Sequence, residues 1–305
     1  MLDRFILGEV NRICPEAPVP VVLVGSEYVS PGGAANIANN IKALGAKVLV
    51  SGIIGDDKNG VMLLDEFRKK KITHEGVFVD KLRPTTLKTR VMAQHQHIVR
   101  FDKEEIFDIN KTIALKILDY VSKAISDIDA IVAIVIGDYG KGVITKDFLK
   151  EIIRIAKRSK KIICVEPNEN HFRYYSGITV LTSNRRKASI ASRIKIVDNN
   201  SLERAGRILL KRTGCKAILI TLGKDGMCLF ERSGEVTYIP TISQEVFDVS
   251  GAGDTVVSAF TLALSCGANM REAAYISNYA ASVVVGKIGI SVATKNELLK
   301  KIMRS

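Results

Sequence analysis

The hydrophobic pattern of the chain changes period repeatedly along most of its length. Segments with apolar residues at helical spacing, as expected for helices that bury one face, cover residues 34–44, 59–70, 110–125, 145–155 and 201–212. Short and nearly continuous apolar runs, typical of strands buried on both faces, lie at residues 48–50, 130–136, 162–165, 178–181 and 217–222. This alternation predicts an α/β fold with a doubly wound, mainly parallel sheet and helices on both faces.

Two stretches break this rhythm, because β-prone segments follow one another there without a helix between them. They lie near residues 18–30 and 75–103, and polar and apolar residues alternate within them. The alternation predicts strands with one solvated face. They form either a small β-sheet lid over a ligand or an ordinary edge hairpin, and we favour the lid. Without repeats, low-complexity tracts or long linkers, residues 1–305 are expected to form a single domain.

Composition narrows the class of protein. Of the 305 residues, 45 are basic and 32 are acidic, but the basic residues do not form one long tract. We therefore expect a solvated surface that helps to steer anionic substrates, and no nucleic-acid partner. Five dispersed cysteines without a C-x-x-C pair fit a reducing compartment. No signal peptide or membrane-length apolar run is apparent, so we expect a cytoplasmic protein without a membrane partner.

The most informative stretch is Val-Phe-Asp-Val-Ser-Gly-Ala-Gly-Asp-Thr-Val at residues 246–256. Its small residues precede a predicted helix, where backbone N–H groups and the helix dipole favour an anion. Asp254 on the first turn is then placed to accept the proton of an attacking hydroxyl. The alternative is a Gly-rich turn in which Asp254 only stabilises the helix N-terminus. Because no Walker-type or dinucleotide-binding fingerprint occurs, we assign phosphate binding to this segment.

This segment resembles the C-terminal signature of the ribokinase-like (PfkB) family of sugar kinases, with Ser250 where Thr is commoner. The run Pro-Gly-Gly-Ala-Ala-Asn at residues 31–36 and the pattern G-x-x-G-x-D-x-x-G at residues 52–60 resemble its N-terminal signature. Further runs resemble the heptose 7-phosphate kinases of this family, at residues 1–4, 12–21, 88–104 and 138–142. The resemblance implies an enzyme that uses ATP and Mg²⁺ to phosphorylate the anomeric hydroxyl of D-glycero-D-manno-heptose 7-phosphate. It also implies a homodimer paired through the lid.

The resemblance implies roles for individual residues. The catalytic base is Asp254, and the anion hole is formed by Gly251, Ala252 and Gly253. The sugar hydroxyls, which suit close backbone approach and polar side chains, are contacted by Asp3, Gly32, Gly33 and Asn36. The cations for the phosphate of the substrate are Lys88, Arg90, Arg100 and Lys141. The nucleotide-binding residues are Asn184, Thr221, Gly223, Gly226, Asn278 and Ala281. Core packing explains Ala281 equally well, and the metal ligands are unknown.

Two further acidic residues have two interpretations each. Asp57 either lies near the sugar or caps the helix that follows it, and we favour the cap. Asp248 either orients the anion-hole loop and the metal-bound phosphates, or only forms a turn. Neither interpretation of Asp248 is favoured by the sequence pattern alone.

Three features depart from the family pattern. Relatives carry a strand that ends in Gly-Asp directly before the position of Met1, so we expect a central strand to be absent or truncated, which exposes backbone groups and apolar faces. Lys187 replaces the carboxylate of an N-x-x-E motif associated with Mg²⁺. Residues 166–168 read Glu-Pro-Asn, which lacks a usual cation.

These departures leave two other hypotheses open. One is a weakly active or inactive homologue that acts by binding, and the other is a related sugar or nucleoside kinase with the same mechanism. Many heptose kinases are fused to a nucleotidyltransferase domain with a His-x-x-His motif, which this sequence lacks. We therefore expect no fused domain of that kind and a separate nucleotidyltransferase in the same pathway.

Overall fold

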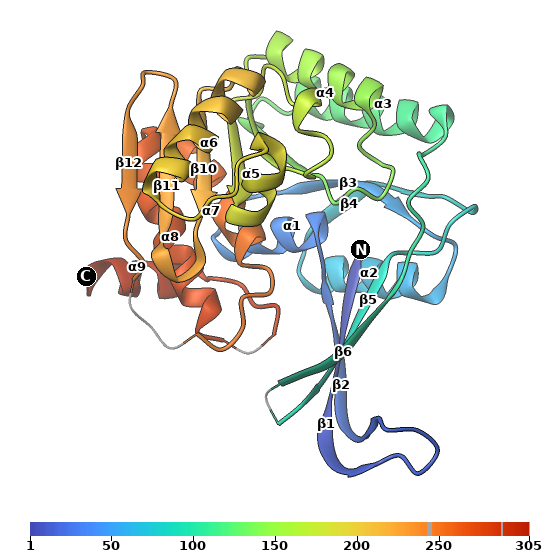
Figure 1. Cartoon of the computed structure of the whole chain (residues 1–305). Helices are drawn as coiled ribbons and strands as arrows, with labels where there is room; N and C mark the ends of the chain where they lie inside the picture. Colours follow the sequence, from blue (N-terminus) through green and yellow to red (C-terminus); the bar gives the residue numbers. More distant parts are fainter. Residues whose placement is uncertain (95, 243–245, 288, 305) are drawn as a thin grey trace.

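The computed structural model describes residues 1–304 except 95, 243–245 and 288. It shows an α/β body from which a narrow β-sheet projects (Figure 1). The main sheet of the body has the strand order β12-β11-β10-β9-β8-β7. Its strands are β7 (Ala133–Gly137), β8 (Ile162–Glu166), β9 (Val180–Asn184), β10 (Ala217–Thr221), β11 (Met227–Glu231) and β12 (Val236–Ile239). Strands β7 to β10 are parallel, whereas β11 and β12 are antiparallel additions at one edge.

Helices cover both faces of this sheet. One face packs against α3 (Lys111–Asp127), α4 (Lys146–Arg158), α5 (Arg185–Ser192) and α6 (Asn199–Thr213). The other face packs against α1 (Ala34–Ala43), α7 (Ala252–Ser265) and α8 (Met270–Val285). Along β8, Ile163 and Val165 face the first group and Cys164 faces the second. The apolar runs therefore form strands buried on both faces, as predicted from the sequence.

The remaining elements of the body lie beside the main sheet. Strands β3 (Leu49–Ile54) and β4 (Thr73–Val79) form a separate parallel pair, joined by α2 (Lys58–Lys69). The chain ends with α9 (Lys295–Met303), and two short 3₁₀ helices lie at Phe172–Tyr174 and Gly223–Asp225. Side-chain caps begin α2, α3 and α4 at Asp57, Asn110 and Thr145. The cap interpretation of Asp57 is confirmed.

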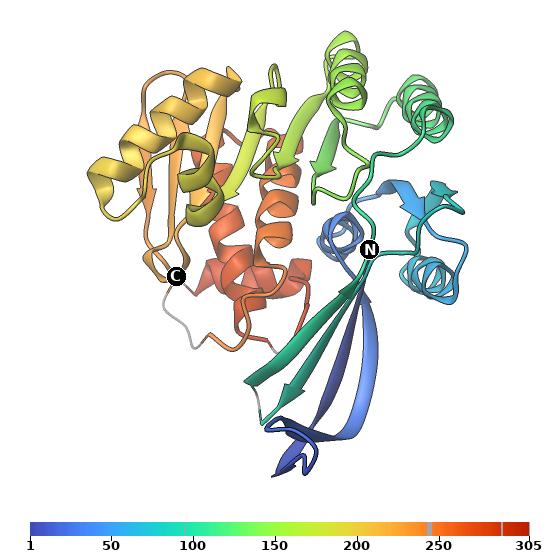
Figure 2. The same ribbon diagram turned by 45° about the vertical axis from the view of Figure 1, so that its right-hand side comes forward.

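The projecting sheet is the predicted lid, with strand order β2-β1-β5-β6. Its strands are β1 (Leu2–Ile13), β2 (Pro20–Pro31), β5 (Leu87–Ala93) and β6 (Gln96–Lys103). Figure 2 shows that the lid meets the body beside the N-terminus. Within the described residues, no helix combines the length and the apolar character needed to cross a membrane.

Two boundaries of the lid were predicted wrongly. The segment at residues 75–79 belongs to β4, which pairs with β3 in the body because α2 supplies the crossover that a parallel pair needs. The segment at residues 2–13 was not expected to be a strand, yet β1 lies at the centre of the lid. Only its first residues are buried, and its far end is mostly exposed on both faces, so the sequence carries little apolar alternation there.

The sheet of the body is interrupted between β3 and β7. Within the described residues, β7 has β8 as its strand neighbour and β3 has β4, and neither pairs with the other.

Candidate active site

Asp254 lies on the first turn of α7, where three distant segments of the chain meet. Its side chain is buried and accepts two hydrogen bonds. The Asn36 amide of α1 donates from Nδ2 to Oδ2 at 2.8 Å, and the Tyr139 hydroxyl donates to Oδ1 at 2.5 Å. Tyr139 lies just beyond the carboxyl end of β7. Both carboxylate oxygens are therefore fixed in direction before a substrate arrives.

A buried relay orients the Asn36 amide. Asn40 Nδ2 donates to the Asn36 backbone oxygen at 3.0 Å and to its side-chain oxygen at 3.3 Å. The Thr255 hydroxyl in turn donates to Asn40 Oδ1 at 2.8 Å. Because these bonds occupy the amide oxygens, the Asn36 nitrogen is left to face Asp254. The α1–α7 contact thus serves the geometry of the carboxylate as well as packing.

The surroundings of Asp254 make it a stronger base than a free aspartate. Burial raises the pKa of the carboxyl to about 7, because the charged form loses water. The hydrogen bonds from Tyr139 and Asn36 lower that pKa, and the charges of Glu166 and Asp3 raise it. Burial also holds the pKa of Tyr139 well above its ordinary range, so this hydroxyl stays a donor. A pKa near 7 suits a general base at neutral pH.

The segment predicted to form an anion hole leads into the first turn of α7. Gly251 precedes α7 with φ of 79°, a left-handed conformation that favours glycine. The Ala252 N–H donates to the Val249 oxygen at 3.2 Å, so it is engaged within the loop. The N–H groups of Gly253 and Asp254 lie in the first turn, where a helix offers them no acceptor. These two groups are the available anion donors.

The sugar-side residues come together beside Asp254. Asp3 is buried on β1 and forms an ion pair with the Arg90 guanidinium of β5. A side chain on Gly32 would overlap the Asp3 carboxylate, so only glycine allows this approach. Gly33 has φ of 55°, and a side chain on it would press against Met1 and Tyr139. Asp3, Gly32, Gly33 and Asn36 thus lie close together, and their contact with sugar hydroxyls stays a prediction.

Three of the four candidate cations for a substrate phosphate, Lys88, Arg100 and Lys141, belong to one ionic cluster. Lys88 Nζ lies 2.6 Å from Asp102 and 3.3 Å from Glu104, and Lys141 lies 2.5 Å from the other Glu104 oxygen. Arg100 contacts Asp102 at 3.2 Å but is more than half exposed. Since Arg90 holds Asp3, the pair formed by Lys88 and Lys141 is best placed to exchange a carboxylate for a phosphate.

Sequence reasoning missed the residues that hold these groups. Glu104 bridges Lys88 and Lys141, and the guanidinium of Arg83 donates to the Lys141 oxygen at 2.9 Å and to the Phe107 oxygen at 2.8 Å. Arg83 is buried and paired with Asp80 at 2.8 Å. No local motif marks Arg83, because its partners lie in loops far along the chain.

The predicted nucleotide residues lie at the carboxyl ends of β9 and β10 and on α8. Asn184 and Thr221 are direct neighbours across the parallel pair. Gly223 and Gly226 both have positive φ, and a side chain on Gly226 would overlap the Ile239 oxygen. Asn278 donates to the Pro240 oxygen at 2.9 Å, whereas Ala281 is buried in the core. The burial of Ala281 fits the core-packing interpretation, and its contact with a nucleotide stays a prediction.

Lys187 lies where the family pattern has a carboxylate, and it forms an ion pair with Glu166. Its Nζ is 2.7 Å from Glu166 Oε1, and Thr182 donates to the other Glu166 oxygen at 3.1 Å. The Glu166 carboxylate lies against the Gly253 backbone of the anion hole. A cation therefore lies near the predicted anion hole, carried by Lys187 and not by residue 168.

Asp248 satisfies the turn interpretation and also leaves an acceptor open. Its Oδ1 accepts the Ser250 N–H at 2.8 Å, which closes the loop before the anion hole. Its Oδ2 is buried with no hydrogen-bond partner in the part of the chain that the structure describes.

A family model described as "pfkB family carbohydrate kinase" matches residues 5–296. The chain belongs to this family. It is therefore a phosphotransferase that acts on a sugar hydroxyl, and the buried base and first-turn donors above are the parts that such a transfer requires.

Curated relatives match nearly the whole chain. Bifunctional protein HldE of Geobacter metallireducens is 44% identical over 299 residues, which are 98% of this chain and 60% of that protein. Bifunctional protein HldE of Helicobacter hepaticus is 39% identical over 302 residues, which are 99% of this chain and 62% of that protein. The chain thus spans about 60% of the length of the curated relatives it matches.

Solved structures confirm the predicted fold class. Phosphofructokinase-2 from Escherichia coli superposes with a TM-score of 0.81 at 16% identity, over 99% of this chain and 95% of that one. Ribokinase from Thermotoga maritima gives a TM-score of 0.74 at 22% identity, over 99% of this chain and 96% of that one. At these identities the likeness establishes the ribokinase-like fold and not the substrate.

Proposed function

We propose that the chain transfers the γ-phosphoryl group of ATP to the anomeric hydroxyl of D-glycero-D-manno-heptose 7-phosphate, giving the 1,7-bisphosphate. The environment of Asp254 is the main support for this transfer. Its carboxylate is buried, has a raised pKa and accepts hydrogen bonds from Asn36 and Tyr139. The choice of heptose rests on the runs at residues 12–21 and 88–104. Identities of 39–44% to the HldE proteins support it.

The proposed reaction uses groups that are already in place. The Asp254 carboxylate removes the proton of the C1 hydroxyl as its oxygen bonds to the γ-phosphorus, and the bond to the bridging oxygen of ATP breaks. The N–H groups of Gly253 and Asp254 and the α7 dipole stabilise the charge that develops on the transferred group. Asn36 and Tyr139 keep the carboxylate aimed at the acceptor.

The 7-phosphate of the substrate is assigned to the ionic cluster beside the lid. Lys88 and Lys141 share Glu104, so a phosphate that displaces this carboxylate gains both cations without a change of fold. Arg83 keeps the Lys141 backbone in position.

Magnesium fits this site as a companion of ATP. Among the described residues, no group of three histidine, cysteine or acidic side chains could hold a metal ion. Mg²⁺ is commonly bound by one or two carboxylates together with substrate phosphates, and Glu166 is the carboxylate that fits. When bound, the ion supplies neutralising charge to the phosphates. Lys187 competes for the same carboxylate.

A homodimer through the lid is part of the proposal. Large apolar side chains on β2 and β6 are about half exposed or more, namely Leu23, Val24, Val99 and Phe101. Exposed apolar groups that gather on one sheet are typical of an interaction surface. We also propose that a separate nucleotidyltransferase acts in the same pathway and uses the product.

A coupled assay of ADP release tests the proposal directly. Heptose 7-phosphate is compared with ribose, adenosine and fructose 6-phosphate as acceptor. We expect kcat/KM to be highest with the heptose. A higher kcat/KM with another acceptor would show that the chain is a kinase with a different substrate, and it would contradict the choice of heptose.

Absence of turnover with every acceptor, despite measurable binding of nucleotide or sugar, would favour the binding-only homologue. The ion pair of Lys187 with Glu166 favours this second candidate function, because it places a cation where the family pattern has a carboxylate associated with Mg²⁺.

A further inference from the structure

Asp138 is a buried acidic residue that the proposed transfer does not use. The residue is 1% exposed and lies just beyond the carboxyl end of β7. Its Oδ2 accepts the Tyr175 hydroxyl at 2.6 Å and lies 2.7 Å from Nδ1 of His171, and its Oδ1 accepts the Gly140 N–H at 2.9 Å. Since an ionised carboxylate can only accept, Nδ1 of His171 carries the hydrogen in this contact. We call Asp138, His171 and Tyr175 the clasp.

The clasp joins two loops that leave neighbouring strands. Loop 138–142 follows β7, and segment 168–175 follows β8. The Tyr175 hydroxyl also accepts the Asn168 N–H at 2.9 Å. Gly140 has φ of 67°, and a side chain there would overlap the Asn168 amide. The two loops therefore pack closely, and segment 168–175 supports loop 138–142.

Loop 138–142 carries two groups of the candidate active site. The Tyr139 hydroxyl donates to Asp254 at 2.5 Å, and Lys141 Nζ lies 2.5 Å from Glu104 in the ionic cluster. The first contact aims the proposed base, and the second belongs to the site that we assign to the substrate phosphate. A shift of this loop would therefore disturb both proton removal and acceptor binding.

The direction of the Tyr139 side chain depends on its neighbour Asp138. The Asp138 N–H donates to the Glu166 oxygen at 2.9 Å, which extends the pairing of β7 with β8 by one residue. Successive side chains of an extended strand point to opposite sides. Asp138 contacts segment 168–175 on one side, and Tyr139 contacts Asp254 on the other. Fixing the Asp138 carboxylate thus fixes the backbone from which Tyr139 projects.

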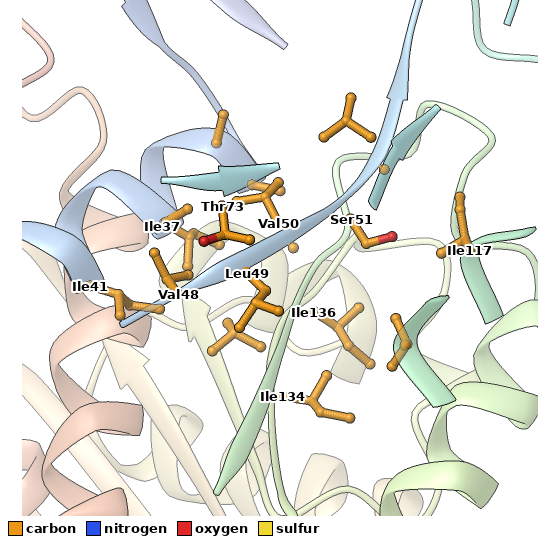
Figure 3. Close-up of a pocket in the computed structure, with 18 of the residues that line it drawn as sticks. Ile37, Ile41, Val48, Leu49, Val50, Ser51, Thr73, Ile117, Ile134 and Ile136 are labelled. Atoms are coloured by element: carbon orange, nitrogen blue, oxygen red, sulfur yellow. The ribbon is translucent and has the colours of Figure 1, made fainter. Parts of the chain in front are cut away.

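Strand β7 gives the loop little support along its other edge. Figure 3 shows Ile134 and Ile136 of β7 in the wall of a cavity of about 710 Å³. Within the described residues, β7 pairs only with β8. The beginning of the loop is therefore held from the β8 side, where the clasp lies, whereas Arg83 holds its other end through the Lys141 oxygen at 2.9 Å.

We propose that Asp138 and His171 are positioning residues for the phosphoryl transfer. The clasp holds loop 138–142 so that Tyr139 aims the base and Lys141 stays within reach of the substrate phosphate. The part played by Lys141 rests on the proposed function, whereas the part played by Tyr139 needs only the transfer itself. Nδ1 of His171 completes the clasp, because without it the buried carboxylate loses a charge-assisted hydrogen bond.

The first test removes or keeps the Nδ1 donor. His171→Leu removes it, whereas His171→Asn retains an N–H donor at a similar position in the side chain. In His171→Leu, kcat should fall at least about tenfold, since a hydrogen bond to a buried charged group is lost and the base is misaligned. KM for heptose 7-phosphate should rise about threefold or more as Lys141 shifts, and KM for ATP should stay at the parent value. His171→Asn should keep most of the parent kcat and KM.

His74→Leu is the matched control. Nδ1 of His74 also has a single printed partner, the Ile72 oxygen at 2.9 Å, but this residue lies in β4, outside both loops. The control should leave kcat and both KM values unchanged. Parent kinetics in His171→Leu would overturn the proposal. A fall in kcat that only follows the folded fraction, with both KM values unchanged, would also overturn it.

A double-mutant cycle shows whether the clasp acts through the Tyr139 hydroxyl. Tyr139→Phe should lower kcat in the parent, because Asp254 loses the donor at Oδ1. In the His171→Leu background the same change should have little further effect, since the hydroxyl is already misplaced. Effects on kcat that multiply fully would contradict a positioning role through Tyr139.

Amide exchange tests the clasp without turnover and so separates it from the choice of substrate. Exchange at residues 139–142 should become at least about tenfold faster in His171→Leu, stay near the parent rate in His171→Asn and remain unchanged in β10. Unchanged exchange at residues 139–142 in His171→Leu would overturn the proposal, whichever acceptor the enzyme uses. Faster exchange together with no turnover of heptose 7-phosphate would support the clasp and contradict the choice of heptose.

Discussion

Two regions of the body differ in burial although their strands are similarly apolar. We call β8, β9 and β10 the continuous half, and β3 and β7, which border the interruption between the two sheets, the interrupted half. In β8, β9 and β10 nearly every residue is buried, whereas in β3 and β7 most residues are half-buried. Strands β8, β9 and β10 carry Glu166, Asn184 and Thr221, which we assign to the phosphate side. Strand β7 leads to Tyr139, which we assign to the sugar side. A continuous apolar run thus indicates that a strand requires packing partners on both faces. The burial of its side chains in the structure shows whether those partners are present.

Asp254 lies where the two halves meet, and its replacement should have the largest effect. Asp254→Asn keeps the shape and removes the basicity, so kcat should fall by about 10² to 10⁴. ATP binding, measured by calorimetry, should change little. Asp57→Asn is a matched control because Asp57 caps α2 and asparagine caps a helix equally well. Equal turnover of the Asp254 variant and the parent would remove Asp254 from the mechanism.

Cavity-forming substitutions in the two halves sharpen the comparison of burial. Leu181→Ala in β9 removes a fully buried side chain and should cost roughly 2–5 kcal/mol of unfolding free energy. Ile134→Ala in β7 removes a half-buried side chain that lines a cavity of about 710 Å³ and should cost about 1–2 kcal/mol. Denaturant unfolding measures both values. Equal costs would show that the interrupted half is as well packed in solution as the continuous half.

Much of the fold follows from local sequence, because its signals lie within a few residues of each other. The caps at Asp57, Asn110 and Thr145 each accept an N–H three residues later, and they fix the starts of three helices. The segments that form β8, β9 and β10 are almost entirely apolar, so the sequence predicted them as buried strands. Strand β1 was not predicted because its outer half is mostly exposed, so its sequence carries little apolar alternation.

Candidate site residues could be proposed from the sequence only where a motif contains them. Asp254, Asn36 and the glycines lie in recognisable runs. The Tyr139 hydroxyl meets Asp254 across 115 positions of sequence, and Arg83 meets Lys141 across 58. Such contacts are set by how β7 and the lid are placed, which no local pattern encodes. The pairing of Lys187 with Glu166 also required the structure, since the sequence suggested only a lost carboxylate.

The raised pKa of Asp254 predicts how stability depends on pH. In the folded chain this carboxyl keeps its proton up to about pH 7, whereas in the unfolded chain it loses the proton near its ordinary pKa of about 4. The folded state therefore binds more protons between these values, and the contribution of Asp254 to stability falls as pH rises through this window. Asp254→Asn should raise Tm at pH 8 and have less effect at pH 4. A constant difference in Tm across this range would contradict the pKa assignment.

The smallest expected effect concerns the ion pair of Lys187 with Glu166. The Glu166 charge raises the pKa of Asp254, and Lys187 offsets that charge at 2.7 Å. Lys187→Met should therefore shift the acidic limb of the kcat/KM profile to higher pH, by up to about one unit. Arg186→Met is the control, because Arg186 is largely exposed and pairs with Glu169 instead.

Lys187→Glu separates this electrostatic role from metal binding. A second carboxylate beside Glu166 should lower the Mg²⁺ concentration needed for half-maximal activity, since Mg²⁺ favours oxygen ligands near phosphate. If the variant needs as much Mg²⁺ as the parent while the pH profile of Lys187→Met shifts, Lys187 acts on the base alone. If neither quantity changes, the ion pair stabilises the end of β8 and does not influence phosphoryl transfer.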